Sequence, residues 1–487
     1  MALPSLSFTR ADGNTGSARS APIGVFAIIA ASASGTAAQP TSLTSKKQAI
    51  TIFGHGVLTE DAAYLFDVAN KSVVGVKVAA STDGTYGTLT TTGAPASTPS
   101  AITAGTSKPL DRFRVVVRFP VGGTVGTAGA MWQASLDGGK TFSAAAALGT
   151  ANSITIPDTG VSLALGAGGL AAGETVSFTT TGPKASLADI TPCLDALKAT
   201  GLNFEAILID SVEADAAMVN GIRTALSGYM SKGLSKRAIV NVRPKTAVET
   251  GQAYIDALNI ISSTARTGTR VDVCADGSYV PSPVRGVSMW RPTSLVLAGR
   301  IAKIALGTDA GYVADGPVDG ASLYDENGVS VAWDEAATPG LDDLGYVTLR
   351  SFARRAGAFI GNPRVFSPIG SDFVFDQQER CMCVAEERAF DFLTDELSAK
   401  KRKDPVKGPN GEVYLLEADV AEMEQKGTLD LKSILGKEVD DVRLKLSRVD
   451  DVGANSGAIV TASVEISSLV YLKGFAVTSR FVRSFNV

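Results

Sequence analysis

The sequence predicts a multidomain protein of mixed α/β and α+β character. A parallel-sheet α/β core is expected to carry an inserted all-β domain and extended arms at both ends. Two observations predict this class. Helix and strand patterns alternate three times between residues 191 and 275, and such repeats build parallel sheets with flanking helices. Residues 81–184 interrupt that pattern with a stretch rich in Gly, Thr, Ala and Ser that has almost no helical periodicity.

The first 80 residues divide into an arm and the first part of the core. Residues 1–21 mix Ser, Gly, Arg and Asn with few apolar anchors, so we expect an extended arm that only a partner orders. Residues 22–80 contain a strand, a helix with Ala63, Phe66 and Ala69 on one stripe, and a second strand, predicted over 24–30, 59–69 and 73–78. This opening is typical of a mixed α/β domain.

Residues 81–184 are predicted to form the inserted domain, on the outside of the protein. Apolar residues alternate with polar ones over 113–119, 131–135 and 175–179, which favours strands. Asp137-Gly138-Gly139 is typical of a tight hairpin turn.

Residues 185–344 carry the main α/β core. Thr191 followed by Pro192 predicts a capped helix that ends near residue 199. Strands then alternate with helices, the strands over 204–210, 238–242 and 271–275 and the helices over 214–230 and 248–262. An apolar helix is predicted over 295–306, and residues 312–342 are expected to be loop-rich and acidic.

Residues 345–468 are assigned to a C-terminal domain. Leu349, Ala353, Ala356 and Ile360 fall at helical spacing, so a helix is predicted over 344–360. Two further helices are expected, an amphipathic one over 376–398 and a short acidic one over 417–426. The clearest strand of the sequence covers residues 458–466, where apolar and polar side chains alternate.

Residues 469–487 form the last segment, and they are again rich in strand-forming residues. An apolar strand at the end of a domain must pair its backbone with its own sheet or with that of a neighbour, because open edges are adhesive. We therefore expect both arms to contribute strands between subunits, through Leu6 and Phe8 at one end and Tyr471, Phe475, Val477 and Phe481 at the other.

Composition excludes several classes of function. The net charge is −4, so there is no basic footprint for nucleic acid, and no direct nucleic-acid partner is expected. Four scattered cysteines fit reduced thiols in a cytoplasm. The apolar run 23–33 lacks an adjacent basic region and falls short of a membrane span, so neither export nor membrane insertion is indicated.

Candidate catalytic and metal residues are few. His55 is the one histidine, and the two thiols of Cys381 and Cys383 would point to different faces of a helix, so no metal-ligand set is predicted. Asp210 follows a strand where α/β sheets hold ligands, but no dinucleotide or Walker motif occurs. The acidic residues of the loop do not match a calcium loop; they are Asp325, Asp334, Glu335, Asp342 and Asp343. A hydrolytic or nucleotide-binding enzyme that uses His55 and Asp210 remains an alternative.

A basic run follows the amphipathic helix, at Lys400, Lys401, Arg402 and Lys403. It lacks the interleaved aromatics of a nucleic-acid site. It is either a solvated helix end that the helix dipole favours or a patch that faces an acidic protein partner.

Three groups of residues resemble the contractile tail sheath proteins of bacteriophages. Residues 22–30 followed by 45–54 are similar to the first strand of that family and its Phe-Gly turn. Leu297-Ala-Gly-Arg-Ile-Ala302 resembles the segment that opens the family's C-terminal region. Residues 350–364, Gly370-Ser-Asp-Phe373 and the helix with Glu379-Arg380 resemble its most recognisable block, while residues 81–184 lie outside the resemblance.

The resemblance implies a structural subunit of a virion tail, assembled in the host bacterial cytoplasm. In such sheaths, hexameric rings stack helically around a rigid tube, and neighbouring subunits exchange strands through their terminal arms. The implied partners are further copies of the chain, the tail tube protein, and the baseplate and tail terminator proteins. The basic run would then face the tube, and no catalytic residue or cofactor is required. The sheath of a phage-derived device, such as a tailocin or a type VI-like system, fits equally.

Overall fold

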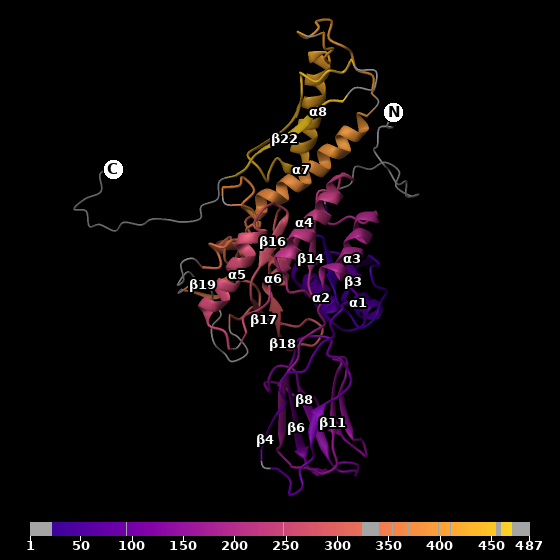
Figure 1. The fold of residues 1–487 in the computed structure, drawn as a ribbon, viewed down its shortest axis with the longest axis vertical. Coiled ribbons are helices and arrows are strands. Elements are labelled where there is room, and N and C mark those ends of the chain that lie inside the picture. The colour runs from indigo at the N-terminus through magenta and orange to yellow at the C-terminus, as the bar shows by residue number, and fades with distance from the viewer. Residues whose placement is uncertain are drawn as a thin grey trace, which may run out of the picture. The chain divides into compact units, whose positions relative to one another are not determined.

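The computed structural model describes residues 22–93, 95–246, 248–323, 340–352, 354–368, 370–397, 399–409, 411–453 and 459–469. The chain divides into two compact units, Met1–Asp395 and Glu396–Val487. The mixed α/β class predicted from the sequence is confirmed (Figure 1). Among the described residues, no helix combines the length and the apolar character that crossing a membrane requires.

The first unit is built on a six-stranded sheet. Its strands are β1 (Phe26–Ala30), β2 (Thr41–Leu43), β3 (Val73–Lys77), β14 (Ala206–Ile209), β15 (Arg237–Asn241) and β16 (Val271–Cys274). They lie in the order β16-β15-β14-β1-β3-β2, and every pair is parallel except β2 with β3 at the edge. The largely parallel sheet expected from the βαβ pattern is therefore present.

Helices cover both faces of this sheet. They are α1 (Lys46–Phe53), α2 (Val57–Ala69), α3 (Leu187–Ala199), α4 (Ala216–Met230), α5 (Gly251–Ala265) and α6 (Thr293–Lys303). Side chains alternate along a strand, so β1 directs Ala27 and Ile29 into one hydrophobic core and Phe26 and Ile28 into the other. The first core is completed by α3, α4 and α5, and the second by α1, α2 and α6. The result is a three-layer α/β arrangement.

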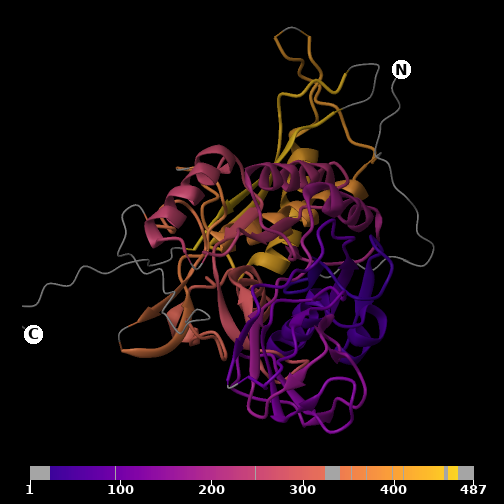
Figure 2. The same ribbon diagram turned by 60° about the horizontal axis from the view of Figure 1, so that its bottom comes forward.

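The inserted domain consists of antiparallel sheets. A five-stranded sheet is ordered β4-β13-β6-β8-β9, with β4 (Thr90–Thr92), β6 (Arg114–Val121), β8 (Met131–Ser135), β9 (Ala146–Ala147) and β13 (Thr175–Thr179). The remaining strands form a three-stranded and a two-stranded sheet from β5 (Ile102–Ala104), β7 (Gly123–Thr124), β10 (Ser153–Ile156), β11 (Val161–Leu165) and β12 (Gly169–Leu170). Together they enclose a third hydrophobic core. This domain, purple to magenta in Figure 2, lies beside the indigo segment of residues 22–80.

A hairpin that the sequence reasoning missed joins the core to the inserted domain. Strands β17 (Gly277–Pro281) and β18 (Ser288–Pro292) pair antiparallel between β16 and α6. Met289 of β18 belongs to the hydrophobic core of the inserted domain, while Val280 of β17 belongs to that of α1, α2 and α6. The hairpin thus contributes to both hydrophobic cores.

Three local predictions are wrong. The helix over 344–360 is a hairpin of β19 (Leu349–Phe352) and β20 (Arg355–Ile360), in which Leu349 and Ile360 pair across the strands and are both buried. Helix α3 is capped by Ser186, whose hydroxyl accepts from the Asp189 N–H, and Pro192 lies inside it. Asp137 does not form a tight hairpin, because β8 ends at Ser135 and its partner β9 begins only at Ala146; the Asp137 carboxylate accepts from the N–H groups of Lys140 and Thr141, each at 3.0 Å.

The last helix of the first unit is α7 (Asp376–Asp395), close to the predicted range. In the second unit, α8 (Glu417–Leu435) is longer than predicted and packs on β21 (Asp441–Leu446). Strand β22 (Ala462–Ser467) pairs antiparallel with β21, and the expected alternation along it is confirmed, with Ala462, Val464 and Ile466 half-buried and Ser463 and Glu465 exposed.

Candidate functional site at the junction of the core and the inserted domain

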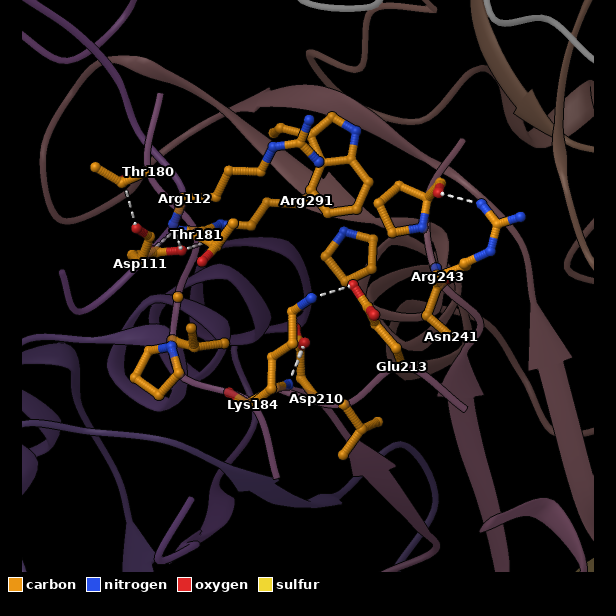
Figure 3. A pocket seen from close by; sticks show the side chains of 18 of the residues that line it. Asp111, Arg112, Thr180, Thr181, Lys184, Asp210, Glu213, Asn241, Arg243 and Arg291 are labelled. Carbon is orange, nitrogen blue, oxygen red and sulfur yellow. Dashed lines mark hydrogen bonds and ion pairs between the residues drawn. The ribbon is translucent and has the colours of Figure 1, made fainter. Parts of the chain in front are cut away.

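A cavity of about 420 Å³ lies where the core meets the inserted domain (Figure 3). Asp210 and Ser211 follow β14 and line it together with Asn241 at the end of β15, and Thr180 and Arg112 come from the inserted domain. After β1 the chain passes through β2 to α1 and α2 on one face of the sheet, and after β14 it runs to α4 on the other face. The cavity is therefore at the topological switch point, where open α/β sheets commonly hold ligands.

Two carboxyls meet at this point, those of Asp61 in α2 and Asp210 after β14. The two carboxyls are both fully buried and lie close enough for the charge of one to affect the other. Burial, and then the charge of Asp210, raise the pKa of Asp61 well above its ordinary value. Burial also raises the pKa of Asp210, against the hydrogen bond from the Ser211 N–H. Burial therefore disfavours the anionic form of both groups of this carboxyl dyad.

Arg291 of β18 connects the same region to the inserted domain. Its guanidinium donates two parallel hydrogen bonds to the carboxylate of Asp111, at 2.9 and 2.8 Å, and lies 3.5 Å from Glu60 of α2. Glu60 also pairs with Arg285 at 3.2 Å and accepts from the Ser282 hydroxyl at 2.7 Å. All of these charged groups are buried or nearly so. Buried ion pairs of this kind hold one geometry, since each partner is left uncompensated if the other moves.

The rim of the cavity is polar, and most of its cations already have partners. Lys184 pairs with Glu213 at 2.6 Å, and Arg243 makes two hydrogen bonds to Glu249, at 2.8 and 2.6 Å. The guanidinium of Arg112 stacks on the ring of Trp290, 4.5 Å from its centroid. The rim therefore ties elements of the core to one another and to the inserted domain.

The structure separates the two residues of the enzyme alternative. The His55 Nε2 atom lies 3.5 Å from the Asp158 carboxylate of the inserted domain, whereas the carboxyl of Asp210 lies beside that of Asp61. His55 therefore lies at the junction, where it contacts the inserted domain and not Asp210. In the part of the chain that the structure describes, no three His, Cys, Asp or Glu residues are grouped as a metal site would require. All four cysteines are buried thiols without a disulfide.

Other predicted residues lie elsewhere or outside the described residues. Lys401 pairs with Glu396 at 2.7 Å, Arg402 pairs with Asp419 at 2.5 Å, and both Lys400 and Lys403 are exposed. This run follows the end of α7 and is not part of the helix. Asp342 pairs with Arg364 at 3.0 Å. The predicted arm residues lie outside the described residues; they are Leu6, Phe8, Tyr471, Phe475, Val477 and Phe481. The same holds for three acidic loop residues, Asp325, Asp334 and Glu335.

Sequence reasoning missed the charged junction, although one signal was present. Glu60 and Asp61 fall in the first turns of α2, a largely apolar helix, and nine consecutive residues of its first part are buried. Two adjacent acids on so apolar a helix indicate buried partners. The partners Arg285 and Arg291 lie more than two hundred residues away, so their identity could not be read from spacing.

Fold and junction together define a class: a three-layer α/β protein whose inserted β domain is held to the core by buried ion pairs. Residues 3–364 match the family described as DUF2586, N-terminal domain, and the chain belongs to this family. No curated protein sequence matches it significantly.

Over nearly its full length, the chain matches solved contractile tail sheath proteins. The sheath tail protein of Listeria innocua shares 12% identity with a TM-score of 0.45, covering 92% of this chain and 96% of that one. That of Desulfitobacterium hafniense shares 10% identity with a TM-score of 0.45, covering 94% and 100%. The helical sheath of the anti-feeding prophage in its contracted state shares 10% identity with a TM-score of 0.49, covering 99% and 100%.

Proposed function

We propose that this protein is the subunit of a contractile tail sheath. Copies of it form stacked hexameric rings around a tail tube, and the sheath contracts to drive the tube through a bacterial envelope. The sheath belongs either to a phage virion or to a phage-derived device. Support comes from the segments that resemble sheath proteins, which lie in the order of that family, and from an open strand edge in the second unit.

The open edge belongs to β22. The Ser447 N–H donates to Thr461 O, and hydrogen-bonded pairs alternate along an antiparallel ladder. Arg443 and Glu465 are therefore hydrogen-bonded to each other. Leu444 and Val464 belong to the other kind of pair, and their N–H groups point away from the partner strand. On β21 the side chains of α8 accept these N–H groups. Leu444 N donates to Thr428 Oγ1 at 3.1 Å, and Leu446 N donates to Glu424 Oε1 at 2.8 Å.

Among the residues that the structure describes, none covers the corresponding groups of β22. Within the described residues, the N–H groups of Ala462, Val464 and Ile466 donate no hydrogen bond, and their side chains are only half-buried. A two-stranded sheet is marginal by itself, and an exposed edge accepts a further strand. This edge is the single observation that carries the proposal, because it can take a strand from the arm of a neighbouring subunit.

Strand addition supplies enough free energy to hold rings together. Each main-chain hydrogen bond contributes a net ~0.5–1.5 kcal/mol, so an arm with about five of them contributes a few kcal/mol per contact. Contraction would then exchange one packing of the subunits for another while the strand pairing stays intact. No catalytic residue takes part in this function.

Deletion of an arm tests the proposal. We expect the purified full chain to form striated tubes under the electron microscope. Variants without residues 1–20 or 469–487 should remain folded monomers, because the donated strand is lost while both units keep their cores. Circular dichroism checks the fold, and negative-stain microscopy with sedimentation checks assembly. Tubes from either truncated protein would refute the exchange of strands.

The basic run gives a second prediction. Lys401 and Arg402 pair with acids of their own unit, so the exposed Lys400 and Lys403 are the cations available to a tube surface. Changing both to Glu should weaken co-sedimentation of the sheath with its tube protein, more at low salt than at high salt. Reversal of Lys437, a lysine outside the run, is the control. Equal binding by the variant and the native protein would remove this run from the tube interface.

A further inference from the structure

Helix α7 meets the sheet through a row of ionisable side chains. Asp376, Glu379, Arg380, Cys383, Glu386 and Glu387 recur every three or four residues, which places them on one side of the helix. They face residues at the amino ends of the strands, the edge opposite the cavity. Below, this set is called the ionic row of α7.

The contacts of the ionic row are specific. Arg237 at the start of β15 pairs with Asp272 at 2.5 Å and also with Asp376. Arg380 donates to Glu205, just before β14, at 2.7 Å. The other two pairs are Arg270 with Glu386 at 2.7 Å and Lys236 with Glu387 at 2.6 Å.

The ionic row and the strand residues that it contacts together contain more acids than bases. Four cations, Lys236, Arg237, Arg270 and Arg380, face six carboxyls, Glu205, Asp272, Asp376, Glu379, Glu386 and Glu387. Lys71 and Asp391, at its two ends, add one charge of each sign. Glu379 is 2% exposed, and in the described part of the chain it forms no ion pair. A buried carboxylate without a cation is unfavourable, so the row is balanced only when carboxyls carry protons.

The apolar side of α7 is separate from the two hydrophobic cores that line the sheet. Its buried apolar residues Cys381, Val384, Ala385 and Ala389 belong to neither hydrophobic core that lines the sheet. The helix is therefore attached to the strands mainly through the ionic row. Its docking should respond to protonation far more than that of α3, α4 or α5, which contribute apolar residues to a hydrophobic core.

We propose that α7 is a proton-controlled latch, which docks on the amino ends of the strands when Glu379 is protonated and loosens when Glu379 loses its proton. The groups that face Glu379 are Arg270, Arg237 and Asp272 from the strands, and Asp376, Cys383 and Glu386 from its own helix. Deprotonation of Glu379 adds a buried anion without an ion-pair partner beside Asp376 and Glu386, whose partners are Arg237 and Arg270. The inference concerns the first unit alone and does not depend on the proposed function.

The titration of the site agrees with this geometry. Burial raises the pKa of Glu379 to about 7, with Arg270 and Arg237 opposing the shift and Glu386 and Asp376 adding to it. Burial, and then the charge of Asp376, also raise the pKa of Asp272. A carboxyl whose pKa is raised on docking favours the docked state fully below the ordinary glutamate pKa of 4.5, and this advantage is lost as the pH rises through about 7.

Hydrogen exchange of the α7 amides tests the latch in the full-length protein. After correction for the intrinsic exchange rates, their protection factors should fall by about 30-fold between pH 5.5 and pH 8.5. In Glu379→Gln, a neutral mimic of the protonated acid, the protection should stay high and independent of pH. Asp395→Asn, at the exposed end of the same helix, is the control and should follow the native protein.

Two results would overturn the inference. If α7 in the native protein keeps constant protection over this pH range, the latch does not exist, and no variant is needed to show it. If Glu379→Gln retains the native slope, the proton resides on another group. The amides of α4 in the first hydrophobic core serve as an internal reference, because a general loss of stability would lower their protection as well.

Discussion

Replacement of Arg291 with Met should lower the free energy of unfolding by about 3–5 kcal/mol at pH 7. The change removes the cation that Asp111 and Glu60 share and leaves both carboxylates buried beside the Asp61–Asp210 dyad. Met preserves most of the volume, so the loss reports on charge more than on a void. Urea denaturation measures it, in the native protein and in the variant.

The pH dependence separates electrostatics from packing. Without Arg291, the raised pKa values of Asp61 and Asp210 should rise further, so the variant regains stability relative to the native protein as the pH falls. Lys184→Met, which removes an exposed ion pair at the same cavity, should cost less than about 1 kcal/mol. A loss below 1 kcal/mol for Arg291→Met, or one that is equal at pH 5 and pH 8, would contradict the role given to the junction.

Replacement of Val464 with Pro should raise the concentration needed for tube formation at least about tenfold, if the proposed function holds. Proline has no N–H group and cannot accept a neighbouring strand at this position. The Val464 N–H faces the open edge of β22, so the pairing with β21 keeps its hydrogen bonds. Sedimentation of the protein over a concentration series measures assembly.

Two matched variants make this test specific. Val464→Thr keeps the N–H group and the branched shape, and it should assemble as the native protein does. Ser463→Pro removes a hydrogen bond within the β21–β22 pair and should destabilise the second unit itself. Normal assembly of a correctly folded Val464→Pro protein would place the donated strand elsewhere.

Strong local periodicity explains which elements could be predicted. Residues 206–209 form a continuous apolar run, residues 271–274 are apolar except for Asp272, and helices precede both, so a parallel sheet follows from the pattern. The 349–360 hairpin was mistaken for a helix, because Leu349 and Ile360 are eleven residues apart and satisfy a helical spacing as well as a cross-strand pair. Gly357 has a φ of 99°, which no α-helix accommodates, but this angle is set only in the folded chain.

The candidate site was predictable only in part. Asp210 was placed correctly at the carboxyl end of a strand, since strand ends are set by the local pattern. Its partner Asp61 was not found, and the alternative partner His55 proved to contact Asp158. Ion pairs across two hundred residues depend on how the layers pack, and no spacing in the chain encodes them.

By itself the sequence determined the class of fold, the alternation of helices and strands between residues 191 and 275, and the alternation of side chains along β22. These features depend on hydrophobic periodicity, which acts over a few residues at a time. Only the tertiary structure decided which acids meet which arginines, which edge of the β21–β22 sheet is covered by α8, and which carboxyl of α7 lacks a cation. Burial and charge balance are properties of a folded neighbourhood, and distant segments create that neighbourhood when they pack together.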